Sequence, residues 1–135
     1  MQITAKTEYA VRAIYELVNR NCICSIKSIC KAQNLPIKFV EKLFRKLGES
    51  GIIASKKGKK GGYYLSKKPS EVSLKNIMDA LDEGSGLYCF NNKDTKNYCK
   101  REDCIFIPIW LEIKNHFDDY FSQISLEGLY KKLGG

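Results

Sequence analysis

The feature that most constrains the fold is a change of hydrophobic period at residues 52–65. Apolar residues 52–54 are followed by Ser55-Lys-Lys-Gly-Lys-Lys-Gly-Gly62 and then by the Tyr-Tyr-Leu of residues 63–65. Two short apolar runs around a glycine-rich turn predict a β-hairpin. The turn carries four lysines on a backbone that glycine leaves free to approach a phosphate chain closely.

Three helices are expected before this hairpin. Apolar residues recur at helical spacing over 7–20, which places Glu16 on the opposite, polar face. A short second helix over 25–32 can be capped by Ser25, and a third amphipathic helix follows over 37–49. Helix, short helix, turn, helix and basic hairpin is the order of a winged helix-turn-helix domain, whose recognition helix enters the major groove.

The charge is concentrated in the same part of the chain. The 135 residues carry a net charge of +8, but residues 1–72 contain 15 basic and 5 acidic residues, a net charge of +10. Residues 73–135 contain 8 basic and 10 acidic residues, a net charge of −2. We therefore expect the first part to bind a polyanion, double-stranded DNA, and the second part to have another role.

The outward residues of the expected recognition helix and of the hairpin are the candidate DNA contacts. A carboxylate such as Glu41 can accept a hydrogen bond from a cytosine amino group, and the wing lysines would contact phosphates or the minor groove. Of the two wing tyrosines one should pack inward and the other lie exposed, because strand residues alternate faces. The candidates are Lys38, Glu41, Lys42, Arg45, Lys56, Lys57, Lys59, Lys60 and Tyr63.

The remainder of the chain predicts a helix over 73–83, a loop over 84–103 without helical or strand period, a long helix over 105–124 and a short one over 126–133. One face of the long helix is too apolar to be left in water, which predicts a partner surface. The fold class is therefore mainly α with a small β-hairpin wing. Residues 1–72 would form the winged helix-turn-helix, and residues 73–135 the cysteine loop and dimerisation helices.

Several segments along the chain form a recognisable set: Thr7-Glu-Tyr-Ala-Val-Arg-Ala13, Phe39-Val-Glu-Lys-Leu-Phe-Arg-Lys-Leu47 with Gly51, Lys57-Gly-Lys-Lys-Gly-Gly-Tyr63, Asp79-Ala-Leu-Asp82, Trp110 and Ser125-Leu-Glu-Gly-Leu129. They resemble the Rrf-type winged-helix regulators, the family of IscR, NsrR and CymR. The resemblance covers nearly the whole chain and implies a bacterial transcription regulator, expected to be a repressor. It also implies a homodimer with crossing C-terminal helices and recognition helices about 34 Å apart on a pseudo-palindromic operator.

The same resemblance implies an iron-sulfur cluster held by three loop cysteines, here Cys89, Cys99 and Cys104. IscR-like members have a histidine three residues after the last cysteine, where this chain has Ile107. Other relatives use a carboxylate of the partner subunit, and Glu8 stands at that position. A 2Fe-2S cluster is favoured over a 4Fe-4S cluster, with iron-sulfur status, redox state or nitric oxide as the signal. The only histidine, His116, is expected to lie at the surface or an interface.

Two alternatives remain open at this point. One is a family member without a cluster, regulated by thiol modification or by a partner protein, as CymR-like members are. The other is a structural zinc module. Cys22 and Cys24 are a poor zinc chelate because one residue separates them, and Cys30 is expected to be a buried packing residue.

Other classes of protein are disfavoured. We expect no enzyme, because the chain has one histidine and neither a glycine-rich phosphate loop opening a helix nor a nucleophile–base arrangement. We expect a cytoplasmic protein without membrane association, because Lys6 and Glu8 interrupt the start of the chain and no apolar run reaches the about 20 residues of a membrane span.

Overall fold

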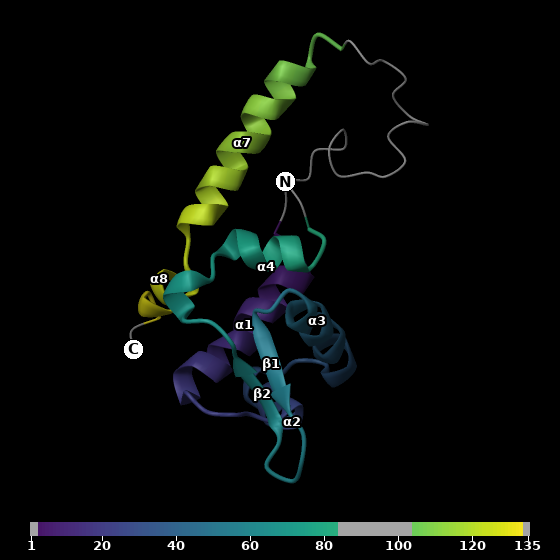
Figure 1. Ribbon diagram of the computed structural model, residues 1–135, viewed down its shortest axis with the longest axis vertical. Coiled ribbons are helices and arrows are strands. Elements are labelled where there is room, and N and C mark those ends of the chain that lie inside the picture. Colours follow the sequence, from purple (N-terminus) through teal and green to yellow (C-terminus); the bar gives the residue numbers. More distant parts are fainter. Residues whose placement is uncertain (1–2, 84–103, 134–135) are drawn as a thin grey trace.

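The computed structural model describes residues 3–83 and 104–133 (Figure 1). Its first three helices are α1 (Ala5–Arg20), α2 (Ile26–Gln33) and α3 (Ile37–Glu49), as the hydrophobic period predicts. Ser25 caps α2, since its hydroxyl accepts a hydrogen bond from the backbone N–H of Ser28 at 3.2 Å. The expectation of a mainly helical chain with a small β-hairpin is confirmed.

The face of α1 that carries Glu16 differs from the sequence-based expectation. Glu16 is buried, and its carboxylate accepts hydrogen bonds from Arg20 at 2.9 Å and from Gln33 at 3.0 Å. The prediction of an outward Glu16 is wrong because a donor one helical turn away and another on α2 replace the water that this carboxylate loses.

The hairpin consists of β1 (Ile53–Lys56) and β2 (Gly62–Leu65), paired antiparallel with Ile53 opposite Leu65. The connector between α1 and α2 joins it through a bridge between Cys24 and Tyr63. A side chain cannot be placed at Gly62, because its φ is +157° and a Cβ atom would lie 2.3 Å from the Cys24 carbonyl oxygen. This glycine therefore lets the wing approach the helical body closely.

The second part of the chain begins with the 3₁₀ turn η1 (Pro69–Glu71) and α4 (Leu74–Ala80). It ends with α7 (Ile107–Gln123) and α8 (Leu126–Lys131). Helix α4 stops three residues before the predicted end at residue 83, and Asp82 takes a left-handed conformation with φ +60°. Helix α7 starts two residues later than predicted, with Pro108 in its first turn, where proline is well tolerated.

The C-terminal segment returns to the body of the protein. The backbone N–H of Leu74 donates to Ile124 (2.8 Å) and that of Leu126 donates to Val72 (2.9 Å). One buried cluster therefore contains residues from both sides of the expected boundary between residues 72 and 73, Ile14 and Phe44 on one side and Leu126 on the other. The division of the chain into residues 1–72 and 73–135 therefore stays a prediction about function, and the two parts share one hydrophobic core.

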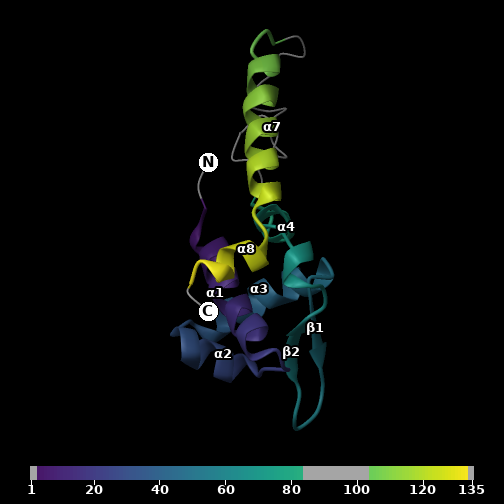
Figure 2. The ribbon, with the colours of Figure 1, turned by 90° about the vertical axis from the view of Figure 1, so that its left-hand side faces the viewer.

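Helix α7 projects away from this core as a single arm, at the opposite end of the molecule from the wing (Figures 1 and 2). None of its residues is buried. No helix in the described part of the chain is both long and apolar enough to cross a membrane.

Tyr130 fastens α8 to α1 and provides a test of the packing. Its hydroxyl donates a hydrogen bond to the carbonyl oxygen of Val11 at 2.7 Å, and its ring meets that of Tyr15 at 5.2 Å. We expect Tyr130→Phe to lower the free energy of unfolding by about 1 kcal/mol, measured by urea denaturation. Tyr64→Phe is the matched control, because the Tyr64 side chain on β2 is 40% exposed. Equal losses from the two variants would contradict this role of Tyr130.

Candidate DNA interface and cysteine site

Helix α3 presents one apolar and one charged face. Val40, Leu43, Phe44 and Leu47 are buried, whereas the four predicted base and phosphate contacts are exposed: Lys38, Glu41, Lys42 and Arg45. Their common exposure follows from their helical spacing, since residues three and four positions apart share one face. This face is free to enter a groove of DNA.

Two aromatic contacts fix the orientation of α3. The ring of Phe44 meets that of Tyr63 on β2 in an edge-to-face arrangement, with centroids 5.0 Å apart and an interplanar angle of 71°. The ring of Phe39 meets that of Tyr9 on α1 at 5.5 Å and 87°. Such pairs stabilise by more than their buried area, so α3 is tied to the wing and to the first helix.

The wing places its basic residues at its tip. Lys56, Lys57, Lys59 and Lys60 are all exposed. A Cβ atom on Gly61 would lie 2.2 Å from the Lys56 carbonyl oxygen, so the tight turn depends on this glycine. The lysines therefore gather on a narrow projection that can follow a phosphate backbone or the minor groove.

The two wing tyrosines face opposite sides, as strand alternation predicts. Tyr63 is half-buried and lines an open depression between α3 and the wing together with Glu41, Arg45 and Ser55. Tyr64 is 40% exposed and lines a cavity on the other face of the hairpin. The packing of the Tyr63 ring on Phe44 supports the DNA-reading surface.

The residues that lead into the cysteine loop are tied to the DNA-binding helices. Lys46, in the last turn of α3, donates to the Asp82 carboxylate at 2.9 Å. The Glu83 carboxylate accepts hydrogen bonds from Thr4 and, at 2.6 Å, from the buried Thr7 hydroxyl. Sequence reasoning missed these contacts, because partners 36 to 79 positions apart leave no local pattern.

The predicted metal ligands are only partly described. Cys104 is half-buried directly before α7, whereas Cys89 and Cys99 lie outside the described residues. Glu8 is exposed in the first turn of α1, next to the Thr7 that binds Glu83. Ile107 begins α7, and the side chain of His116 is 78% exposed further along it, as expected for a surface residue.

Three cysteines lie in the DNA-binding half. Cys30 is buried in α2, as predicted, and burial raises the pKa of its thiol, with the nearby Glu41 carboxylate adding to the effect. Cys22 is exposed and Cys24 is buried in the connector before α2. No group of three or more histidine, cysteine, aspartate or glutamate side chains within residues 3–83 and 104–133 is arranged to hold a metal ion.

This arrangement matches a known family along almost the whole chain. The sequence profile of the Rrf2 family, described as an iron-dependent transcriptional regulator, matches residues 3–132. The chain belongs to the Rrf2 family. Its members bind DNA and regulate transcription, and they are not enzymes. The protein is therefore a DNA-binding transcription regulator.

Individual relatives agree with this assignment. An HTH-type transcriptional regulator of Synechocystis is 30% identical over 132 residues, which cover 96% of this chain and 88% of the relative. The structure of T. potens IscR matches with a TM-score of 0.71 and 26% identity, covering 98% of this chain and 88% of that one. CymR, the global cysteine regulator of B. subtilis, shares the fold with a TM-score of 0.73 at 24% identity, over 98% of both chains.

The wing lysines give a prediction about salt dependence. We expect the double substitution of Lys59→Gln and Lys60→Gln to weaken binding to a non-specific DNA duplex. The slope of log K against log salt concentration should become shallower by about 0.9 for each lost phosphate contact. Fluorescence anisotropy at several salt concentrations measures both effects. Lys131→Gln with Lys132→Gln is the matched control, since these exposed lysines lie at the end of α8. Equal slopes for the two double variants would contradict a wing contact.

Proposed function

We propose that this regulator is a homodimeric repressor whose affinity for a pseudo-palindromic operator is controlled by an iron-sulfur cluster, 2Fe-2S in preference to 4Fe-4S. Cys89, Cys99 and Cys104 of one protomer and Glu8 of the partner subunit would be the ligands. The cluster would make the protein responsive to iron-sulfur status, redox state or nitric oxide. A dimer in two successive major grooves blocks access to that DNA, which supports repression.

Helix α7 supports the homodimer. None of its 17 residues is buried. Large apolar side chains are exposed to solvent along the helix and just before it. An apolar surface of this kind is costly to leave wet and marks an interaction site. A second copy of α7 fits this surface, because a two-fold axis brings the same patch of each subunit together. The exposed residues are Ile105, Phe106, Ile109, Leu111 and Tyr120.

The chemistry of the donor set fits a cluster. Thiolates are the ligands that cluster iron prefers, and a carboxylate can complete the set. Within the described residues, the half-buried Cys104 and the exposed Glu8 are suited to these roles, and no described residue forms a hydrogen bond with the Glu8 side chain. An oxygen ligand leaves iron more open to exchange than a fourth thiolate does, which suits a sensor.

The strongest support for this proposal comes from the hydrogen bonds that Asp82 and Glu83 form with α3 and α1. These two residues directly precede the cysteine-bearing segment, and they bind Lys46 of α3 and Thr7 of α1. A change in that segment would therefore act on the end of the recognition helix and on the turn of α1 that holds Glu8. These contacts support a coupling between the segment that holds the proposed ligands and the DNA-reading surface.

The first test is the composition of protein purified without oxygen. We expect brown protein with visible absorption, iron and acid-labile sulfide near the stoichiometry of one cluster per protomer. Glu8→Ala should change the absorption spectrum and shorten the lifetime of the cluster in air several-fold, because one ligand is lost. Glu49→Ala, at an exposed glutamate at the end of α3, is the control and should change neither.

Two results would separate the alternatives. Colourless protein without iron or sulfide from iron-replete cells would contradict the cluster and favour the cluster-free candidate. Zinc in place of iron would favour the structural metal module. The assignment as a DNA-binding regulator would stand in both cases, because it rests on family membership.

The dimer has its own test. We expect Ile109→Asp to raise the dissociation constant of the dimer at least about tenfold, because the interface would have to bury an unpaired charge. Sedimentation velocity measures this change, and circular dichroism checks that the helices remain. Asn115→Asp adds the same charge at an exposed polar position of α7 and serves as the control. Ile109→Asp protein that remained dimeric to the same extent as the control would contradict an interface through this face.

A further inference from the structure

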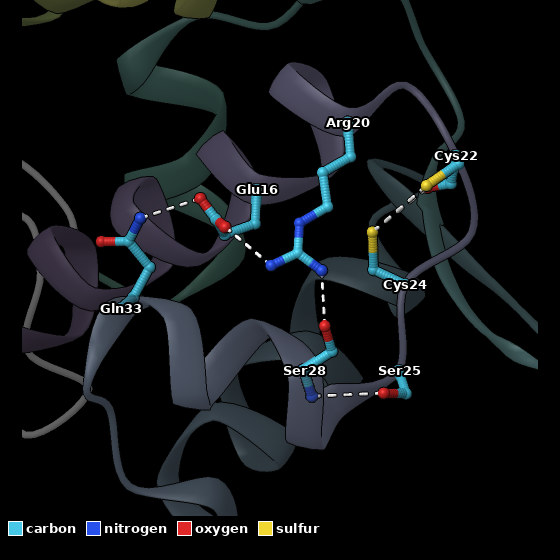
Figure 3. A network of polar contacts seen from close by, with 7 residues as sticks. All are labelled: Glu16, Arg20, Cys22, Cys24, Ser25, Ser28 and Gln33. Atoms are coloured by element: carbon cyan, nitrogen blue, oxygen red, sulfur yellow. Dashed lines mark hydrogen bonds and ion pairs between the residues drawn. The ribbon is translucent and has the colours of Figure 1, made fainter.

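Cys22 and Cys24 take no part in the proposed cluster, yet their sulfur atoms face each other in the connector between α1 and α2 (Figure 3). The two Sγ atoms lie 3.8 Å apart. Cys22 is exposed, whereas Cys24 is only 4% exposed. We propose that this pair is a redox-active dithiol, which a low-molecular-weight disulfide oxidises to an intrachain disulfide at the base of the wing.

The spacing allows the bond and predicts that it is easily reduced. Side chains two positions apart in extended chain point to the same side, with Cα atoms up to about 6.8 Å apart. Disulfides span Cα distances of about 4.4–6.8 Å, so a pair in fully extended chain would lie near the upper limit. Strained disulfides have more oxidising potentials and are the labile, regulatory ones. The pair is therefore suited to reversible oxidation rather than to a permanent cross-link.

The different exposure of the two thiols suggests different roles for them in the reaction. Cys22 is open to solvent and can attack an incoming disulfide. Burial raises the pKa of Cys24, and the neighbouring Arg20 guanidinium opposes this shift. Arg20 is held in place by Glu16 at 2.9 Å and by the hydroxyl of Ser28 on α2 (Figure 3). Burial thus protects Cys24 from direct attack by a small disulfide. The neighbouring Arg20 guanidinium can stabilise the Cys24 thiolate once it forms.

The reaction is a balanced thiol–disulfide exchange. The Cys22 thiolate attacks one sulfur of the small disulfide, whose S–S bond breaks and releases one thiol. Cys24 then loses its proton, and its thiolate attacks the Cys22 sulfur and displaces the second thiol. Two protein thiols are oxidised to one disulfide, and the small disulfide is reduced to two thiols.

Formation of the Cys22–Cys24 disulfide would also affect the wing, because Cys24 is hydrogen-bonded to Tyr63 on β2. The backbone N–H of Cys24 donates to the Tyr63 carbonyl oxygen at 2.9 Å, and the N–H of Tyr63 donates to the Cys24 carbonyl oxygen at 2.8 Å. Tyr63 in turn packs on Phe44 of the recognition helix. Because the sulfur atoms must approach from 3.8 Å to about 2.05 Å, the strain is shared between the bend at Cys22 and this bridge.

The test uses the full-length protein, purified without oxygen and treated with oxidised glutathione. Trypsin cleaves after Arg20 and Lys27 and releases residues 21–27, which contain these two cysteines and no other. After denaturation and blocking with N-ethylmaleimide, we expect this peptide to be unblocked and lighter than the reduced peptide by two hydrogen atoms. Dithiothreitol should restore two free thiols. The peptide of residues 28–31, with the buried Cys30, should carry one blocking group and is the internal control.

Two variants assign the roles. Cys24→Ser should trap glutathione on Cys22, because no second thiol resolves the mixed disulfide, and Cys24→Ala serves the same purpose if the buried hydroxyl destabilises the domain. Cys22→Ser should leave Cys24 unmodified. The proposal would be overturned by two free thiols in the oxidised natural protein, by a lasting mixed disulfide on its Cys22, or by attack on Cys24 in Cys22→Ser.

The link to the wing has a separate readout. We expect the amides of Cys24 and Tyr63 to exchange hydrogen several-fold faster in the oxidised protein, because their mutual hydrogen bonds weaken. The amide of Ile14, at the centre of α1 and fully buried, should not change. Unchanged exchange at both bridge amides would overturn the effect on the wing. These results do not depend on the cluster, so the dithiol and the proposed cluster can fail independently.

Discussion

The contact between Phe44 and Tyr63 is the interaction on which the DNA-reading surface depends. A winged helix reads DNA with two separate elements, so the angle between recognition helix and wing must be fixed. Phe44 is almost fully buried, and its edge-to-face packing on Tyr63 joins α3 to β2. The backbone of Tyr63 is also bonded to Cys24, so a single residue connects the recognition helix, the wing and the connector between the first two helices.

The second part of the chain contacts the helices that carry this surface. Asp82 and Glu83 bind α3 and α1 where the cysteine-bearing segment begins. Helix α7 leaves the body as an arm with no buried residue, while α8 returns to the core through Tyr130 (Figures 1 and 2). The return of α8 fixes the base of the arm. In the proposed homodimer, a second copy bound along α7 would therefore set the distance between the two recognition helices.

Local patterns predict the parts of this structure that depend on local physics. Helical spacing gives α1, α2 and α3 to within a few residues, and the glycines among lysines give the wing. The position of Glu16 could not be predicted, because a carboxylate is buried only where donors from other turns or helices meet it. The same applies to Thr7 and Glu83, 76 positions apart. Of the proposed cluster ligands only Cys104 and Glu8 lie in the described part of the chain, and their roles came from a family resemblance rather than from spacing.

Two sulfur sites on one small regulator need not carry the same signal. The proposed cluster would act through Asp82 and Glu83 on the last turn of α3, and the proposed dithiol through Cys24 and Tyr63 on the middle of the same helix. Both routes end on α3 but share no hydrogen bond, so each can change DNA affinity while the other is intact. A chain with this arrangement can combine an iron signal with a thiol signal in a single equilibrium, the binding of its recognition helices to DNA.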